Sequence, residues 1–216
     1  MNPAQQGPPP RSWAALPTVS RRLGFAATLL VFLVGSGLAQ APARELLNSE
    51  RIAAKFGNYG VEVLAQTETL RLSNLYSTKD DVRTCRTFAL VRYPQRIDPR
   101  VAAEHEAIAA GGSIGAVFAA HGWEVRKMHL NYVEIEATPQ LAELMRIEAG
   151  MPLAEHVYVL EVVKGEQVIE YAALVEIHHP DYLRATDLPA IYGPADPNRR
   201  RELVAELVAL ALERAR

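Results

Sequence analysis

Two apolar segments separated by a three-residue turn constrain the fold of this chain most. Residues 154–163 (AEHVYVLEVV) and 167–177 (QVIEYAALVEI) are rich in valine, isoleucine, leucine and tyrosine, the residue types that favour β-strands. The connection between them, Lys164-Gly165-Glu166, is a short turn that contains a glycine. Two strands with such a connection form a hairpin, so the pair predicts an antiparallel sheet.

Further strands and helices are predicted on both sides of the hairpin. The chain has 216 residues, 49% of them hydrophobic, which is enough for one sizeable domain and too apolar for a disordered chain. Strands are expected at residues 61–66, 69–77, 83–93 and 123–137, and helices at 44–56, 100–110, 114–121, 139–147 and 199–216. This mixture predicts an α+β fold in which short helices cover a single antiparallel β-sheet.

The C-terminal part of the chain is predicted to extend a domain formed by residues 44–184. Prolines punctuate the next segment, so residues 185–198 are predicted to be a linker. Residues 199–216 form an amphipathic helix whose apolar stripe comprises Leu203, Val204, Leu207, Val208, Leu210 and Leu212. We expect this helix to dock on the domain. A membrane-surface helix or a partner-binding helix is the alternative, which a polar face mixing Glu with Arg disfavours.

The first 43 residues have the features of an export signal. An arginine-containing flank precedes the uncharged residues 23–43, within which residues 25–34 (FAATLLVFLV) match the apolar region of roughly 7–15 residues in a signal peptide. Small residues that suit cleavage follow at Ala39, Ala41 and Ala43. The alternative is an uncleaved anchor, because residues 23–43 could just span roughly 30 Å of hydrocarbon. Either interpretation predicts a periplasmic or otherwise exported protein, with a possible membrane tether through the N-terminus.

Charge and motifs argue against several classes of protein. The formal net charge is −2 and no basic block is present, so a nucleic-acid partner is not predicted. Cys85 is the only cysteine, which rules out an intrachain disulfide and predicts a small core residue. Gly111-Gly112 lacks the lysine and hydroxyl partner of a phosphate loop, and no serine lies in a nucleophile-elbow pattern.

Histidines near the end of the last predicted strand suggest metal ligands at first sight. His178 and His179 are followed closely by Asp181, and His156 is a possible third ligand. Adjacent residues of a strand point to opposite faces, so His178 and His179 cannot easily serve one ion. The sequence therefore predicts no metal site, and no other cofactor is expected.

Two charged residues occupy unusual positions in the predicted strands. Arg71 lies in an apolar-leaning strand, and Glu176 lies near the end of the last one. One interpretation is an exposed strand face, where Arg and Glu are common in antiparallel sheets. The other is a pocket in which Arg71 binds a carboxylate and Glu176 handles a proton or a hydroxyl group, since a planar guanidinium suits paired hydrogen bonds to a carboxylate.

The order of several segments favours the second interpretation. These segments are Leu70-Arg71 at a strand start, residues 86–94 (RTFALVRYP), residues 112–118 (GSIGAVF), and residues 147–177 (IEAGMPLAEHVYVLEVVKGEQVIEYAALVEI) followed by HHPDYL. With them the chain resembles the chorismate lyase family from about residue 61 to residue 183, and also the related UTRA ligand-binding domain of bacterial repressors. UTRA domains normally follow a winged helix-turn-helix. The sequence shows no such module, so a DNA-binding repressor is not predicted.

The resemblance to the lyases implies a chorismate lyase-like fold and a set of site residues. In the lyases an arginine that opens a strand binds the substrate and a glutamate in the last strand is catalytic; Arg71 and Glu176 fall at the matching positions. The backbone N–H groups near Ile114 and Gly115 would hold a second carboxylate. The implied reaction eliminates pyruvate from chorismate, or from a related enolpyruvyl aromatic acid, to give a 4-hydroxybenzoate-type product without a metal or organic cofactor.

A second function of a different class remains open from the sequence. The resemblance to UTRA domains and the predicted export fit a non-catalytic binding module for a small aromatic carboxylate, on the same fold and with the same Arg71 anchor. One scaffold can host both roles. The sequence predicts no oligomeric state.

Overall fold

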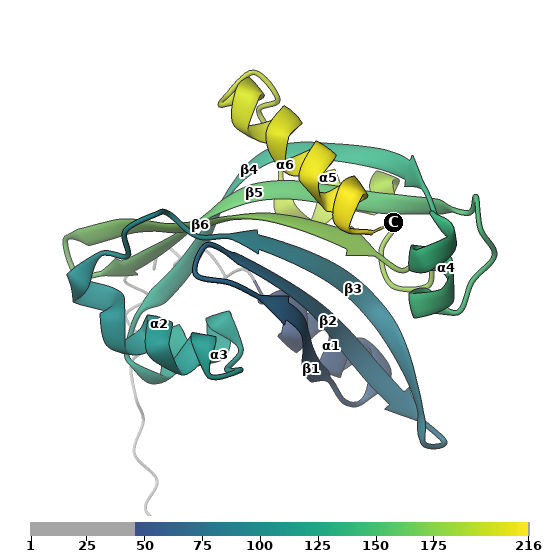
Figure 1. Ribbon diagram of the computed structural model, residues 1–216, viewed down its shortest axis with the longest axis horizontal. Coiled ribbons are helices and arrows are strands. Elements are labelled where there is room, and N and C mark those ends of the chain that lie inside the picture. The colour runs from purple at the N-terminus through teal and green to yellow at the C-terminus, as the bar shows by residue number, and fades with distance from the viewer. Residues whose placement is uncertain (1–45, 216) are drawn as a thin grey trace, which may run out of the picture. The chain divides into compact units, whose positions relative to one another are not determined.

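The computed structural model describes residues 46–215, which contain one six-stranded sheet in the order β1-β2-β3-β6-β5-β4 (Figure 1). The strands are β1 Gly60–Gln66, β2 Leu70–Lys79, β3 Val82–Arg92, β4 Glu124–Glu136, β5 Pro152–Lys164 and β6 Gln167–His178. Every neighbouring pair is antiparallel, including the predicted hairpin of β5 and β6. The predicted α+β class with a single antiparallel sheet is confirmed.

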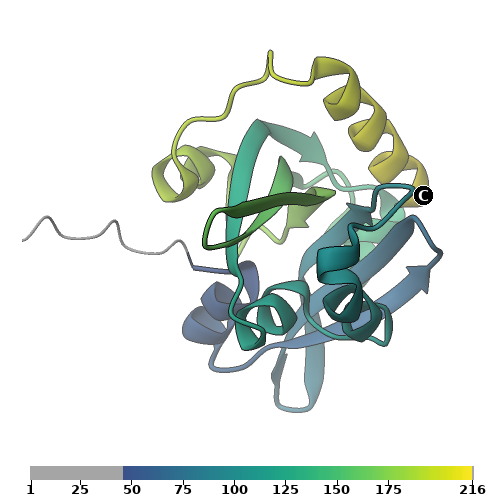
Figure 2. The same ribbon diagram turned by 90° about the vertical axis from the view of Figure 1, so that its left-hand side faces the viewer.

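Helices cover both faces of this sheet. They are α1 Asn48–Phe56, α2 Ala102–Ala109, α3 Ile114–Ala120, α4 Pro139–Met145, α5 Leu188–Tyr192 and α6 Arg201–Arg214, with 3-10 turns at Pro99–Val101 and Ala185–Asp187. Figures 1 and 2 show α6 on one side of the sheet and α1, α2 and α3 on the other. The segment predicted as a linker thus contains a 3-10 turn and the short helix α5, whose Leu188 and Tyr192 are buried.

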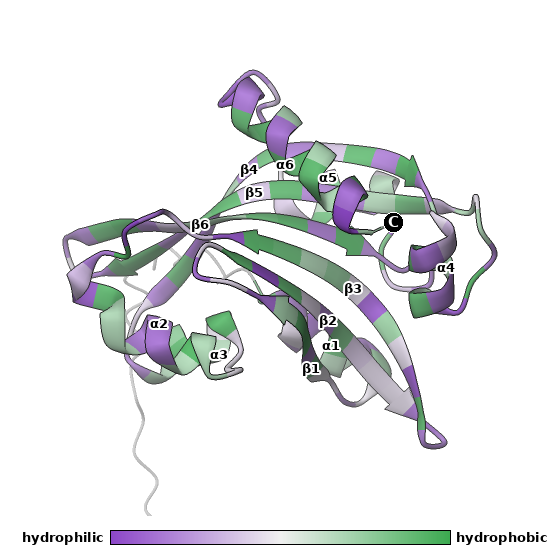
Figure 3. Ribbon diagram, in the orientation of Figure 1, coloured by the Kyte–Doolittle hydropathy of each residue, from purple (hydrophilic) through white to green (hydrophobic). Residues whose placement is uncertain are grey.

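The sheet face under α4 and α6 carries the largest apolar core. Leu90, Val157 and Val175 from the central strands are fully or almost fully buried there. Leu207 and Ala211 of α6 are completely buried against the same cluster. Hydrophobic residues recur along β5 and β6 (Figure 3), as expected for strands covered on both faces. Burial of the apolar side of α6 against this cluster holds the helix on the sheet.

The opposite sheet face packs against α1, α2, α3 and α5 in two smaller clusters. The cluster under α2 and α3 includes Ile108, Phe118 and Tyr171. The cluster under α1 and α5 includes Ile52 and Leu188. A space remains between the two clusters, and it contains the candidate site described below.

One strand pair of the sheet is irregular near its middle. The register of β2 against β3 shifts between Leu75 and Tyr76, because β3 has one extra residue there, Arg86. Cys85 in β3 is buried in the largest core, as predicted. Among residues 46–215, no helix combines the length and apolar character that crossing a membrane requires. The predicted signal peptide or anchor, residues 1–43, lies outside the described residues.

Candidate functional site

A cavity of about 70 Å³ lies between the sheet and the helices α1 and α3. A single water needs roughly 10–15 Å³ by the same kind of measure, so the space suits several waters or one small ligand. Strands β1 to β6 all contribute to its lining, together with the start of α1 and the start of α3. Most of the lining is apolar, with side chains such as Val91, Leu160 and Leu174.

All four residues predicted from the sequence line this one cavity: Arg71, Ile114, Gly115 and Glu176. Arg71 is 2% exposed and Glu176 is 4% exposed. The interpretation of these two residues as part of an exposed strand face is therefore wrong. Alternation along β2 and β6 turns both side chains towards the sheet face under α1 and α3, because residues two apart point the same way.

Arg71 is held in place by the backbone of the α2–α3 connection. Its Nη1 donates hydrogen bonds to the carbonyl oxygens of Ile108 at 2.9 Å and Gly112 at 3.0 Å, whereas its Nε has no hydrogen-bond partner. No carboxylate among residues 46–215 forms an ion pair with it. Burial raises the pKa of the nearby Tyr93 phenol, which stays neutral and supplies no counter-charge. Arg71 thus brings a positive charge without a carboxylate partner to the cavity.

Glu176 belongs to a buried hydrogen-bond network that joins α1 to the sheet. Asn48 Nδ2 donates to Glu176 Oε1 at 3.0 Å and to Thr87 Oγ1 at 3.1 Å. The Tyr182 hydroxyl donates in turn to Asn48 Oδ1 at 2.6 Å, which orients the amide. The second carboxylate oxygen, Glu176 Oε2, has no hydrogen-bond partner in the part of the chain that the structure describes. Asn48 therefore fixes the carboxylate and leaves one oxygen available.

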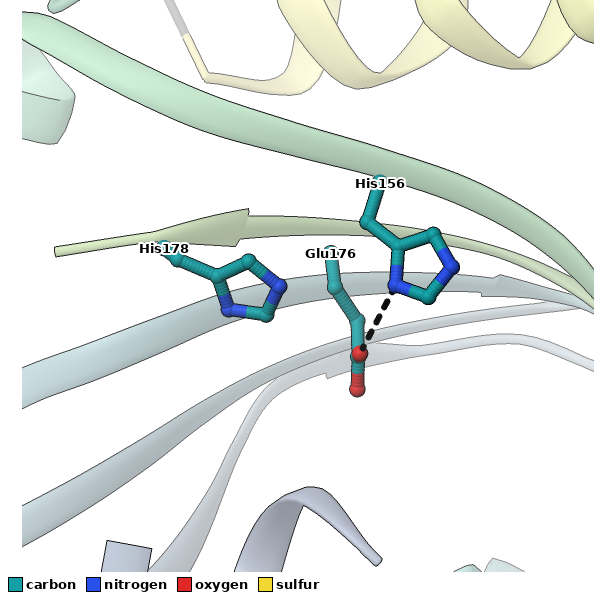
Figure 4. A group of neighbouring side chains, drawn as sticks. All are labelled: His156, Glu176 and His178. Atoms are coloured by element: carbon teal, nitrogen blue, oxygen red, sulfur yellow. Dashed lines mark ion pairs between the residues drawn. The ribbon is translucent and has the colours of Figure 1, made fainter. Parts of the chain in front are cut away.

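Two histidines flank this carboxylate (Figure 4). His156 lies directly opposite Glu176 in the β5–β6 register, and its Nδ1 is 4.0 Å from Glu176 Oε2. Burial lowers the pKa of His156 well below its ordinary value and lowers the pKa of His178 to about 3, and the nearby Lys127 ammonium adds to both effects. Both imidazoles are therefore neutral at physiological pH.

The pair of adjacent histidines separates as strand alternation predicts. His178 points to the cavity side, where one donor atom each of His178, His156 and Glu176 lies within 4.8 Å of the others. His179 is instead paired locally: its Nδ1 accepts from the backbone N–H of Asp181 at 3.0 Å. The grouping of His178, His179 and Asp181 that the sequence suggested at first sight, and that strand alternation argued against, is not formed. His178 lies instead beside His156 and Glu176.

Ile114 and Gly115 are at the first turn of α3, where the helix meets the segment before α1. A Cβ atom at Gly115 would collide with the Leu47 side chain, so glycine permits this close approach. Leu47 and Ile114 both line the cavity. Gly115 therefore has a packing role in addition to the ligand-binding role that the resemblance implies.

Sequence reasoning missed three polar residues of this region. Asn48 lies within a predicted helix, Thr87 lies in a predicted strand, and Lys127 lies on β4 and lines the cavity. None has a local sequence signal. Asn48 reaches Glu176 across 128 positions of the chain, and only the assembled sheet brings them together.

No protein-family model and no curated protein sequence matches the chain. Solved structures that are similar to parts of the chain include domains of transcriptional regulators. The ligand-binding domain of a putative GntR-family transcriptional regulator from Bordetella bronchiseptica has 12% sequence identity and a TM-score of 0.39, covering 57% of this chain and 87% of that domain. The C-terminal domain of the histidine utilization repressor from Pseudomonas syringae has 13% identity and a TM-score of 0.38. The match covers 59% of this chain and 95% of that domain.

A third similar structure is the PhnF C-terminal domain, with 13% identity and a TM-score of 0.39, covering 64% of this chain and 77% of that domain. Identities and TM-scores of this size do not assign a ligand or an activity.

Proposed function

We propose that the cavity binds a small aromatic carboxylate and that Arg71 is its anchor. The observation that carries this proposal is the buried Arg71 guanidinium without a carboxylate partner among the described residues. A buried charge is costly unless an opposite charge or several hydrogen bonds compensate it. The two backbone carbonyls satisfy Nη1 alone. An incoming carboxylate would complete the coordination of the guanidinium by charge-assisted hydrogen bonds.

The register of the sheet supports a ligand with polar groups at both ends. Arg71 pairs with Val91 on β3, whereas Glu176 pairs with Ala89, so the two residues are two strands apart and offset by two positions. Their Cα atoms are thus roughly 12 Å apart, from about 4.8 Å per strand and about 3.4 Å per residue. Apolar residues line the space between them. A ring with a carboxylate at one end and a hydroxyl at the other, of the 4-hydroxybenzoate type, suits this arrangement.

A catalytic form of the same proposal is a chorismate lyase-type elimination. A proton leaves the ring carbon that bears the hydroxyl, and the bond between the neighbouring ring carbon and the ether oxygen breaks, which makes the ring aromatic. The oxygen leaves as part of enolpyruvate, which takes up a proton and becomes pyruvate. Glu176 Oε2, which has no protein partner, supports a role in accepting a hydrogen bond or a proton from that end of the ring. Arg71 would orient the substrate through its carboxylate, and the apolar walls would limit the access of water.

Ligand binding is tested by thermal unfolding of the full chain with 4-hydroxybenzoate. A ligand at 100 times its dissociation constant stabilises the folded state by about 2.7 kcal/mol, so we expect a clear rise in melting temperature. Arg71→Met should abolish the rise, and Arg71→Lys should reduce it because lysine lacks the planar fork. The control is Arg92→Met, which removes an arginine paired with Glu206 outside the cavity. A rise that survives in Arg71→Met would overturn the proposal.

Turnover separates the enzyme from the binding module. Chorismate is incubated with the full chain, and the formation of 4-hydroxybenzoate and pyruvate is followed. Equal amounts of both products, lost in Glu176→Gln and in Arg71→Met, would support the lyase. Binding of 4-hydroxybenzoate without turnover would leave the non-catalytic module as the function.

We further propose that the protein acts outside the cytoplasm, as the apolar segment over residues 25–34 predicts. The intact mass of protein recovered from a periplasmic fraction tests this. A mass that lacks about the first 39 to 43 residues supports a cleaved signal, and the full mass in the membrane fraction supports an anchor. Full-length protein in the cytoplasmic fraction alone would contradict export.

A further inference from the structure

Three buried side chains converge on the cavity side of the β5–β6 hairpin. His156 and Glu176 are register partners across the two strands, and His178 is two residues after Glu176 on the same strand face. His156 and His178 are completely buried, and Glu176 is nearly so. Figure 4 shows the two imidazoles on either side of the carboxylate. The backbone register therefore directs all three side chains to one point.

The atoms that face this point have no hydrogen-bond partners among residues 46–215. They are His156 Nδ1, Glu176 Oε2 and His178 Nε2. The His156–Glu176 separation of 4.0 Å is too long for a direct hydrogen bond, and one donor atom of each residue lies within 4.8 Å of the others. Buried polar atoms without partners are rare in folded proteins, and three that face one another require an explanation.

The opposite atom of each side chain is held by another residue. His156 Nε2 lies 2.9 Å from His129 Nδ1, and His178 Nδ1 lies 3.0 Å from Thr87 Oγ1. Glu176 Oε1 accepts from Asn48. Metal-binding histidines are oriented in the same way, because a hydrogen bond at one ring nitrogen fixes the tautomer that presents the lone pair of the other.

We propose that His156, Glu176 and His178 bind one divalent transition-metal ion of the Zn²⁺ type. Two imidazoles and one carboxylate are a ligand set for such ions, whereas Mg²⁺ and Ca²⁺ prefer oxygen ligands throughout. Bonds of about 2.0–2.1 Å in tetrahedral geometry place ligand atoms roughly 3.3 Å apart. The three side chains would therefore move together by about an ångström or less, and a fourth position would remain beside the cavity wall that Glu176 forms.

Lys127 carries a positive charge that would weaken the binding of a metal ion at this site. It is on β4, and its ammonium lies 4.9 Å from the centre of the Tyr158 ring and 4.7 Å from the centre of the Tyr192 ring. Burial lowers the pKa of both histidines most, and the Lys127 ammonium lowers the pKa of each further. The same charge would repel a bound cation, so Lys127→Met should tighten metal binding several-fold. If the three side chains were buried together only by packing and bound no metal, Lys127→Met would not increase the affinity for a metal ion.

The decisive experiment is a titration of the full chain, freed of metal by a chelator, with Zn²⁺ alone. We expect one ion per chain, and no binding of Mg²⁺ under the same conditions. His156→Gln and His178→Gln should each weaken Zn²⁺ binding by at least 100-fold. The matched control is His179→Gln, which removes a buried histidine adjacent to the trio but not part of it. It should bind Zn²⁺ like the unmodified chain.

Three outcomes would overturn the proposal. The unmodified chain could bind Zn²⁺ below stoichiometry, which would leave a buried water as the group that joins the three atoms. The two trio variants could bind as well as the unmodified chain, or His179→Gln could lose as much affinity as they do. If a trio variant fails to fold, the Co²⁺ absorption spectrum of the unmodified chain and the Lys127→Met titration still decide, because an intense tetrahedral spectrum and tighter binding are both required.

This inference does not depend on the proposed carboxylate ligand. Zn²⁺ is titrated without any organic acid, and Arg71→Met should keep the metal while it loses 4-hydroxybenzoate. Conversely, His178→Gln should lose the metal, and its melting temperature should still rise with 4-hydroxybenzoate. Failure of one proposal is thus distinguishable from failure of the other.

Discussion

The two faces of the central strands differ in what their side chains do. On the face under α4 and α6, alternate residues such as Leu90, Val157 and Val175 form a continuous apolar core. The residues that alternate with these along the strands point to the face under α1 and α3. They include His156 and Glu176, which belong to a group of buried polar side chains. Because strand side chains alternate, the same three strands supply both faces.

The difference shows that one face of the sheet stabilises the fold, whereas the other carries the polar groups that can bind a ligand. The apolar face provides burial, whose stabilising effect grows with the area removed from water. The polar face holds charges that are costly to bury, and the apolar face offsets that cost. We therefore expect substitutions on the first face to change stability and substitutions on the second to change binding.

The largest expected effect is on the apolar face. Leu207 of α6 is completely buried against the sheet. Leu207→Ala should lower the free energy of unfolding by about 2–5 kcal/mol, because it removes buried methyl groups and leaves a cavity. Urea denaturation measures this change. Glu202→Ala, on the exposed side of the same helix, should stay within about 0.5 kcal/mol of the unmodified chain. A loss below 1 kcal/mol for Leu207→Ala would show that α6 is not part of the folding unit.

The second prediction concerns Glu155, a charged residue buried on the apolar face. Neither of its carboxylate oxygens has a hydrogen-bond partner, and burial raises its pKa from 4.5 to about 7. Since the folded-state pKa is above the unfolded one, the full stability is present below about pH 4.5 and falls as the pH rises through about 7. The loss approaches roughly 3 kcal/mol at pH 8, from about 1.4 kcal/mol per pKa unit.

Glu155→Gln removes this titration. The variant should unfold at higher urea concentration than the unmodified chain at pH 8, and the difference should shrink towards pH 5. Urea denaturation at the two pH values measures it. Parallel stability curves for the two proteins would mean that the Glu155 carboxyl is hydrated or paired in solution.

Most helices and strands could be predicted from local sequence signals, above all where turn residues mark their ends. The β5–β6 hairpin and α4 were expected to within a few residues, because turn residues at Lys164–Glu166 and Thr138-Pro139 bound them. The segment at residues 185–198 was predicted as a linker because prolines dominate its pattern. Tertiary burial of Leu188 and Tyr192 stabilises a short helix there that propensity alone does not predict.

The candidate site was predictable only where a resemblance pointed to it. Composition alone favoured an exposed face for Arg71 and Glu176, whereas the order of segments favoured a pocket. Strand alternation correctly separated His178 from His179. It could not show that His156 is the register partner of Glu176, because register depends on pairing between distant segments. Asn48 was missed for the same reason.

The smallest expected change in stability is that of a substitution at Arg71, the buried cation of the cavity. Arg71→Met removes two hydrogen bonds to backbone carbonyls, which costs about 0.5–1.5 kcal/mol each. It also removes a buried charge without a carboxylate partner, which stabilises the folded state. These effects oppose each other, so we expect urea denaturation to give a net change within about 1 kcal/mol. The same variant should lose all stabilisation by 4-hydroxybenzoate. A loss of stability as large as that of Leu207→Ala would make Arg71 a structural residue and would remove the contrast between the two faces.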